Sequence, residues 1–202
     1  AGWGGVLRCG ALRPAAGPGP PRVRTMTNVN LCDDDRLVEF FDFAAQELLW
    51  ASIHIVGGFA MAPIVETSNA DLRKQLEMNT VSAFGSVREA KRRMPKGGRI
   101  VNVAARPALF AELASGMAAY AASKAAVAAI TQAAAEEFWK DGVLVNAVVP
   151  GTLDTPSNRD AMPGADRSGW ASLDAAAATI VFLASPQNRA TRGGLVPVYG
   201  GG

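Results

Sequence analysis

Two titratable side chains, Tyr120 and Lys124, stand four positions apart in the segment YAASK, within an alanine-rich stretch that predicts a helix. Residues at this spacing share one face of a helix, so we expect the phenol and the ammonium to be neighbours. A free phenol titrates at about 10, and a nearby cation stabilises its anion. The pair therefore has the residue types for proton transfer by Tyr120 near neutral pH. The alternative is a surface tyrosine and lysine at a spacing that is common on helices.

A third polar residue, Asn79, falls on the apolar face of a helix predicted over residues 68–94. Ser68 and Asp71 have the spacing of a capping box at the start of this helix. A buried asparagine must find hydrogen-bond partners. Asn79 is therefore either a structural tie between two elements or part of a site with Tyr120 and Lys124.

The elements that must position these residues are short apolar strands that alternate with helices. This alternation predicts an α/β fold with a parallel sheet covered on both faces. Ligands of such sheets bind at the carboxyl ends of the strands. The strands are expected near residues 53–56, 99–104, 143–149 and 195–199, and we expect 1–202 to form a single domain, because 202 residues with 49% apolar composition suit one core.

Several classes of protein are disfavoured by the composition. The net charge is only +2, and no basic helix or zinc-finger spacing is present, so no nucleic-acid partner is expected. No apolar run approaches the roughly 18 residues of a membrane-spanning helix. Cys9 and Cys32 lack metal-ligand spacing, so no metal site is expected, and two cysteines favour a reducing, cytoplasmic location.

Three segments, GRIVNVAA, YAASKAAV and VLVNAVVPGTLDTP, resemble in order and spacing the short-chain dehydrogenase/reductase family. The resemblance implies a Rossmann-like, doubly wound parallel sheet in a three-layer αβα arrangement. It also implies an oxidoreductase that uses NAD or NADP and a small carbonyl substrate. Tyr120 would donate or accept the proton, Lys124 would lower the pKa of Tyr120 and hold the nicotinamide ribose, and Asn79 would anchor a proton-relay water.

The same resemblance implies the cofactor-binding positions and the assembly. In addition to Tyr120 and Lys124, the implied cofactor-binding residues are Gly2, Gly5, Asn30, Leu31, Gly57, Gly58, Pro150, Gly151 and Thr155. Gly57 and Gly58 would let the backbone approach the cofactor. Relatives associate through their helices, so a homodimer or homotetramer is expected through residues 68–94 and 116–137.

Two departures from the family matter. The family serine that hydrogen-bonds the substrate falls at Ala104 or Ala105, with Ala105 the better fit. Losing such a donor typically costs about 3 kcal/mol of transition-state stabilisation. The quinonoid dihydropteridine reductase branch also has alanine there, and the segment VVPGTLDTPSNRDAMPGAD resembles it. This similarity indicates an electron-poor, quinonoid acceptor.

The second departure lies at the N-terminus. The family opens with a strand, a glycine-rich turn and two βα units, whereas residues 1–26 are a short, irregular segment rich in proline and glycine, which we interpret as a loop or arm. Gly2, Gly4 and Gly5 would be the remnant of the glycine turn. A shortened opening leaves a second hypothesis, in which the protein has lost cofactor binding and acts as a structural or regulatory subunit.

Overall fold

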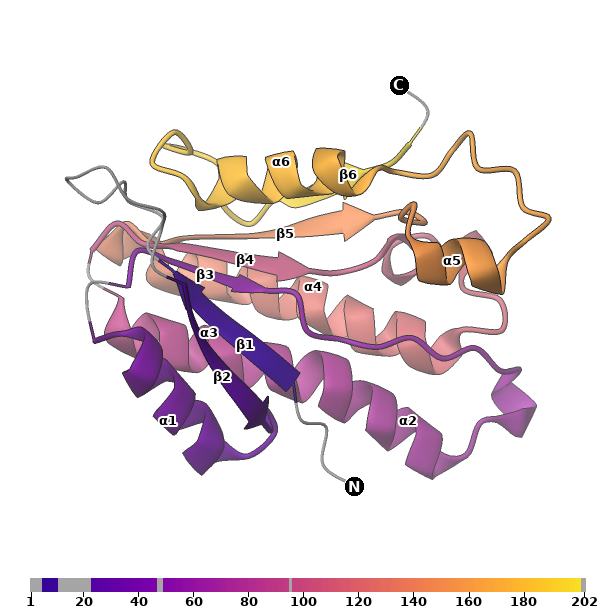
Figure 1. The fold of residues 1–202 in the computed structure, drawn as a ribbon, viewed down its shortest axis with the longest axis horizontal. Coiled ribbons are helices and arrows are strands. Elements are labelled where there is room, and N and C mark those ends of the chain that lie inside the picture. The colour runs from indigo at the N-terminus through magenta and orange to yellow at the C-terminus, as the bar shows by residue number, and fades with distance from the viewer. Residues whose placement is uncertain (1–4, 11–22, 47–48, 95, 201–202) are drawn as a thin grey trace.

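The computed structural model describes residues 5–10, 23–46, 49–94 and 96–200. Its main sheet has four parallel strands in the order β3-β4-β5-β6, which Figure 1 shows side by side. The strands are β3 (Ala51–His54), β4 (Arg99–Val103), β5 (Leu144–Pro150) and β6 (Leu195–Val198). The four strands and their parallel direction confirm the prediction from the alternating pattern.

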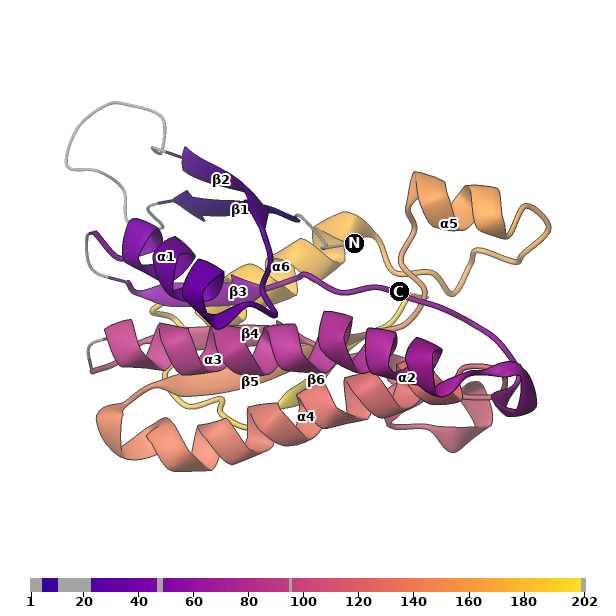
Figure 2. The same cartoon turned by 90° about the horizontal axis from the view of Figure 1, so that it is seen from below.

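Helices cover both faces of this sheet, so the described part of the chain has the expected three layers (Figure 2). The long helices on one face are α3 (Ser82–Arg93) and α4 (Ala118–Phe138), and α1 (Asp34–Ala44) packs on α3. The opposite face carries α6 (Leu173–Ala184). Alternation along β4 explains both cores, because Ile100 packs with the α3 and α4 side chains and Val101 packs with α6.

Side-chain caps fix where the helices begin. Asp33 accepts hydrogen bonds from the backbone N–H groups of residues 35 and 36 at the start of α1. Ser68 and Asp71 form the expected capping box at the start of α2 (Asn69–Gln75), which confirms that prediction. At the start of α6, the Ser172 side chain accepts a hydrogen bond from the Ala175 N–H.

The helix predicted over 68–94 is continuous but is not α-helical throughout. Between α2 and α3, the segment η2 (Leu76–Val81) has π-helical hydrogen bonds. A π segment holds an extra residue in a turn, and such segments occur frequently at functional sites. Asn79 lies within it and has only 1% of its surface exposed, so the prediction that this asparagine faces inward is correct.

The N-terminal part differs from the prediction of a loop or arm without strands. The strands β1 (Gly5–Gly10) and β2 (Val23–Val29) pair antiparallel in a separate two-stranded sheet. The segment with four prolines falls between them at residues 11–22, outside the described residues, so the strands themselves are free of proline. Val29 is buried in the same core cluster as α1 and α3, which ties β2 to the main body.

Shorter turns complete the structure. The loop after β5 contains a short helix that the sequence did not predict, α5 (Pro156–Ala161). Within the described residues, the single turns of 3-10 helix are η1 (Ile64–Glu66), η3 (Arg106–Ala108), η4 (Ala111–Leu113) and η5 (Trp139–Asp141). Among the helices in the described ranges, none has the length and apolar character needed to cross a membrane.

Candidate active site

Lys124 lies one turn after Tyr120 on α4 and reaches the carboxyl end of β4. Its Nζ donates a hydrogen bond of 2.8 Å to the carbonyl of Val103, the last residue of that strand. Only 6% of the lysine is exposed. Burial lowers the pKa of Lys124 to about 8, because removal from water disfavours the charged form. Lys124 is therefore a buried amine at the edge of the sheet where ligands of parallel sheets bind.

Asn79 joins the π segment to α4 and to the loop after β3. Its Oδ1 accepts from the backbone N–H of Gly58 at 2.9 Å, and its Nδ2 donates to the Gly58 carbonyl at 3.0 Å. Nδ2 also lies 3.0 Å from Ser123 Oγ and 3.3 Å from Gln75 Oε1. Asn79 thus fixes the backbone that follows β3 beside the helix that carries Tyr120 and Lys124.

The two glycines after β3 lie where a side chain would collide with the site. A Cβ on Gly57 would be 2.6 Å from Asn79 Oδ1 and 3.1 Å from Lys124 Nζ. A Cβ on Gly58 would be 2.2 Å from the terminal carbon of Met78. A side chain at Gly57 would therefore displace the buried Asn79, whereas at Gly58 it would displace the flexible end of Met78. The contact to Gly57 also shows that Asn79 and Lys124 approach the same point of the chain.

Tyr120 stands at the beginning of α4 with its ring against an aromatic neighbour. The Phe59 ring meets it edge to face, with ring centroids 5.0 Å apart. Burial raises the pKa of Tyr120. This rise is opposite to the expected lowering of the Tyr120 pKa by Lys124. The reason is that desolvation of the phenol dominates, while the Lys124 ammonium donates its hydrogen bond to the Val103 carbonyl of β4.

The two positions where the resemblance predicts the family serine lie at the end of β4. Ala104 and Ala105 directly follow β4 and are both buried. The backbone N–H of Ala104 donates to the Val148 carbonyl, and Ala105 caps the η3 turn in an extended conformation. Neither position supplies a side-chain donor beside the carbonyl that holds Lys124.

The loop after β5 contains the predicted carboxamide-binding residues. Pro150 ends β5, and the N–H of Gly151 donates to the Val198 carbonyl at 3.0 Å. Thr155 caps α5, with its Oγ1 accepting from the Asn158 N–H at 3.1 Å. These residues follow the strand next to β4, at the same edge of the sheet as Lys124. That they bind a cofactor remains a prediction.

The predicted adenine-side residues follow β2. Asn30 Oδ1 accepts from the Cys32 N–H at 3.1 Å, and Leu31 packs against the core. Cys32 Sγ donates to the Glu77 carbonyl at 3.1 Å, which brings this turn to the π segment that carries Asn79. Gly5 lies within β1, opposite Val29, and not in a turn, whereas Gly2 lies outside the described residues.

Sequence reasoning missed three contributors to the site. Ser123 is fully buried, and its Oγ donates to the Tyr120 carbonyl at 2.7 Å while facing Asn79. Gln75 provides a further partner for Asn79, and Phe59 covers the Tyr120 ring. The position of Ser123 between Tyr120 and Lys124 was visible in the sequence. Its inward orientation was not, because the many alanines of α4 leave this helix without a clear apolar face.

His54 has the structural role that its apolar strand suggests. Its two ring nitrogens lie 2.8 Å from Asn102 Oδ1 and 2.8 Å from Ser52 Oγ. Asn102 in turn donates to Thr131 on α4. Burial lowers the pKa of His54 to about 4, so the imidazole is neutral at physiological pH and forms part of the packed sheet.

The site at the carboxyl ends of a parallel sheet, with a tyrosine and a lysine on one helix, defines the class of protein. A family model described as enoyl-(acyl carrier protein) reductase matches residues 11–202. The chain belongs to the short-chain dehydrogenase/reductase family.

Individual relatives support this assignment. The chain is 35% identical over 103 residues to the cyclic-di-GMP-binding biofilm dispersal mediator protein of Escherichia coli K12, covering 51% of this chain and 42% of that protein. It is 31% identical over 145 residues to an NADPH-dependent aldehyde reductase-like protein, chloroplastic, of Arabidopsis thaliana, covering 69% and 53%. A short-chain dehydrogenase from Burkholderia cenocepacia, solved in complex with NADP, superposes with a TM-score of 0.76 at 26% identity, over 87% of this chain and 74% of that one. The chain thus spans about half the length of these curated relatives.

The residues fit one half of a nicotinamide dinucleotide. Lys124 has three protons, and Val103 is its one acceptor among the described residues, so the ammonium can donate to a ribose. Gly57 leaves the space beside Lys124 and Asn79 free of a side chain. A glycine-rich turn for the pyrophosphate is not found in the described ranges, where Gly5 is part of an antiparallel strand.

Proposed function

We propose that this protein is an NAD(P)-dependent oxidoreductase that reduces a carbonyl or quinonoid acceptor, with Tyr120 as the proton donor. The observation that carries the proposal is the approach of Lys124 and Asn79 to Gly57 at the carboxyl end of the sheet. Two relatives of known cofactor, the NADPH-dependent plant protein and the NADP-bound Burkholderia dehydrogenase, support it. When bound, the reduced nicotinamide supplies the hydride.

The side chains have separate tasks in this proposal. Lys124 donates to the ribose with the protons that Val103 does not use, and its positive charge favours ionisation of the neighbouring phenol when the two face the same ligand. Tyr120 donates its proton to the substrate oxygen as negative charge develops there. Asn79 holds the Gly57–Gly58 backbone in place and anchors a proton-relay water. Pro150, Gly151 and Thr155 contact the nicotinamide carboxamide, and Asn30 and Leu31 lie near the adenine.

The acceptor is expected to be electron-poor. Because Ala104 and Ala105 supply no hydroxyl, the substrate oxygen receives one hydrogen bond fewer than in relatives with a serine, a loss of about 3 kcal/mol for an ordinary ketone. A quinonoid ring of the dihydropteridine kind accepts hydride without that assistance. Ala105→Ser is therefore expected to raise turnover of simple ketones and to leave quinonoid reduction unchanged; equal ketone turnover in both proteins contradicts this substrate class.

Two substitutions on α4 test the catalytic assignment. Lys124→Met removes the cation but keeps the helix, and is expected to abolish most activity and to weaken nicotinamide binding. Tyr120→Phe is expected to lose turnover while keeping cofactor affinity, because it removes one proton and one hydrogen bond. Nicotinamide fluorescence gives the affinity, and single-turnover reduction gives the rate. Wild-type activity in either variant refutes the assignment.

A second candidate function is a structural or regulatory subunit without cofactor. The specific observation in its favour is the antiparallel β1–β2 pair, in which Gly5, predicted to bind the cofactor, lies in a strand and not in a turn. Titration with NADH and with NADPH separates the candidates. Binding of either one supports the oxidoreductase, and binding of neither supports the subunit.

Assembly and location complete the proposal. We propose that residues 1–202 form one domain and that the protein is a cytoplasmic homodimer or homotetramer formed through the helices within 68–94 and 116–137. Support comes from a groove between α3 and α4 whose lining includes the exposed Phe84 together with Ile130 and Phe138. Sedimentation equilibrium of the wild type and of Phe84→Glu tests this, since a charge on the contact face is expected to favour the monomer.

A further inference from the structure

A second cavity lies at the opposite end of the sheet from Lys124. It has a volume of about 570 Å³ and opens beside Arg99 and Leu144, the first residues of β4 and β5. Lys124 in contrast binds Val103, the last residue of β4. The candidate active site therefore makes no use of this cavity, although its volume lies in the range of small-molecule sites.

Two exposed arginines line the cavity from the loop between α6 and β6. Arg189 has no hydrogen bond or ion pair within the described part of the chain. The nearest acid to Arg192 is Glu136, at 3.7 Å between two side chains that are 37% and 69% exposed. An exposed pair at that distance contributes little, so both guanidinium groups are available to an anion.

A third arginine adds positive charge from within the protein. Arg99 is 7% exposed and donates to the backbone carbonyls of Gly97, Gly98 and Asn188. These acceptors are uncharged, and no carboxylate among the described residues pairs with Arg99. Carbonyl groups satisfy its protons but do not cancel its charge, so the cavity is electropositive.

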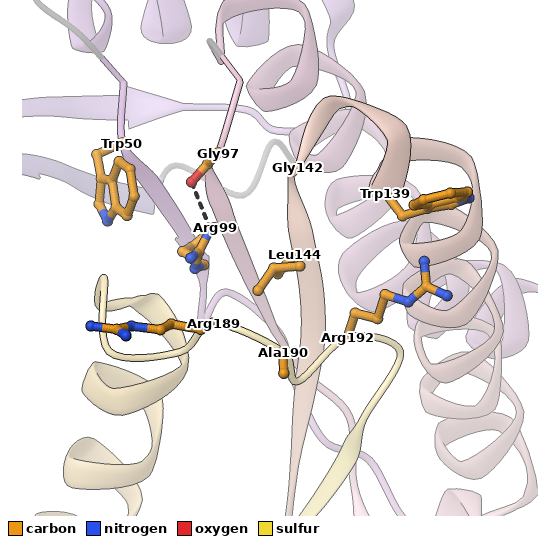
Figure 3. A pocket seen from close by; sticks show the side chains of 9 residues that line it. All are labelled: Trp50, Gly97, Arg99, Trp139, Gly142, Leu144, Arg189, Ala190 and Arg192. Carbon is orange, nitrogen blue, oxygen red and sulfur yellow. Dashed lines mark hydrogen bonds between the residues drawn. The ribbon is translucent and has the colours of Figure 1, made fainter.

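Two tryptophans provide flat apolar surfaces on either side. Figure 3 shows Trp50 and Arg189 on one side of the cavity and Trp139 and Arg192 on the other, with Leu144 between them. The Trp50 indole is fixed by a hydrogen bond of 3.0 Å from Nε1 to the Ala184 carbonyl. The Arg192 guanidinium lies 5.2 Å from the Trp139 ring centroid, and that ring is 48% exposed.

We propose that this cavity is a binding site for a small aromatic anion, a molecule with a planar ring and one phosphate or carboxylate group. In this structure the guanidinium groups of Arg189 and Arg192 point outward on opposite sides of the cavity (Figure 3), and these exposed side chains turn inward to bind the anionic group, since planar forks of N–H donors match both phosphate and carboxylate oxygens. The Trp50 ring already has the Arg99 guanidinium 5.1 Å from its centroid, so the ligand ring packs against the more exposed Trp139 indole once Arg192 turns to the anionic group. The site is separate from the proposed catalytic centre, so the proposal stands whether or not the protein is a reductase.

The test uses four probes on the full chain labelled with nitrogen-15. They are 1-naphthyl phosphate, 1-naphthoate, the uncharged 1-naphthol and inorganic phosphate. Binding of either aromatic anion is expected to shift the indole N–H signals of Trp50 and Trp139 and to leave that of Trp170 in place. The stronger of the two identifies the preferred anionic group, and both 1-naphthol and inorganic phosphate are expected to bind at least about tenfold more weakly, because each lacks one half of the ligand.

Variants separate this site from general attraction to a basic surface. Arg189→Gln removes no intramolecular contact seen in the described residues, so it is expected to fold normally and to weaken binding about tenfold, the loss of one charge-assisted contact. Arg192→Gln is expected to act similarly, and Trp139→Leu to weaken the aromatic anions but not inorganic phosphate. Arg167→Gln is the matched control, because Arg167 also lies over a tryptophan ring, that of Trp170, away from this cavity.

Three results would overturn the proposal. The first is the absence of indole shifts with both aromatic anions at millimolar concentration. The second is unchanged affinity in Arg189→Gln and Arg192→Gln, or a loss as large in Arg167→Gln. The third is binding of 1-naphthol or of inorganic phosphate as tight as that of the aromatic anions. Tight binding of 1-naphthol would indicate a nonspecific apolar surface, and tight binding of inorganic phosphate would indicate a site for a simple anion.

Discussion

Gly57→Ala is the substitution that most directly probes the candidate active site without removing any of its side chains. The new Cβ would lie 2.6 Å from Asn79 Oδ1, closer than folded proteins allow, and 3.1 Å from Lys124 Nζ. The Asn79 side chain is 99% buried, so we expect it to move aside only by giving up its paired hydrogen bonds to the Gly58 backbone. At about 1 kcal/mol for each bond, the free energy of unfolding is expected to fall by about 2 kcal/mol.

Thermal unfolding measures this loss independently of any activity. For a chain of this length, 2 kcal/mol corresponds to a fall in melting temperature of about 4–8 °C. Gly164→Ala is the matched control, since a Cβ there meets no atom within 4 Å and the backbone is not in the left-handed region. Its melting temperature is expected to stay at or slightly above that of the wild type.

A double-substitution cycle identifies the cause. If the clash is with Asn79, the same Gly57→Ala change should cost much less in an Asn79→Ala background, because the oxygen that it meets is gone. Equal costs in the two backgrounds, or a Gly57→Ala protein as stable as the wild type, would refute the reasoning that Asn79 and the chain after β3 are in contact as described.

Two further predictions concern stability. The pKa of His54 is about 4 in the folded protein against an ordinary value of 6.5. Its contribution to the free energy of unfolding is therefore complete above pH 6.5 and is lost as the pH falls towards 4, at up to about 1.4 kcal/mol per pH unit. The free energy of unfolding, measured with denaturant across this range, should depend less on pH in His54→Gln, and an unchanged pH dependence contradicts the burial of a neutral imidazole. Glu89 on α3 is 1% exposed and accepts hydrogen bonds from three arginine side chains. Glu89→Gln is therefore expected to lower the free energy of unfolding by about 3 kcal/mol. Glu39→Gln is the exposed control, which loses one surface ion pair and should lower the free energy of unfolding by less than 1 kcal/mol.

The main sheet could be predicted because each of its elements has a local pattern. Buried strands such as β5 (LVNAVVP) are mostly apolar, and the capping box of Ser68 and Asp71 marks where α2 begins. The inward position of Asn79 followed from the same helical spacing. The strands, the start of α2 and the orientation of Asn79 could be predicted because each depends on residues that are close together in the sequence.

What the sequence could not supply depends on contacts between distant residues. The β1–β2 pair joins two segments on either side of a proline-rich stretch, and neither strand has an alternating pattern that favours it. The rise in the pKa of Tyr120 also escaped prediction, because the Tyr-x-x-x-Lys spacing reports the nearby cation but not the desolvation by the surrounding structure, including Phe59. The pocket of arginines and tryptophans unites residues 50, 99, 139, 189 and 192, which share no motif.

The π segment makes the number of residues between α2 and α3 a constraint in its own right. Each residue added to or removed from an α-helix turns everything beyond it by about 100°, whereas a π turn absorbs one surplus residue. One further residue inserted into η2 would exceed what the π turn absorbs and would rotate Ser68–Gln75 against the rest. Gln75 would then turn away from Asn79, even though every original side chain was unchanged. A protein of this design tolerates point substitutions on the outer face of that helix far better than a single-residue insertion.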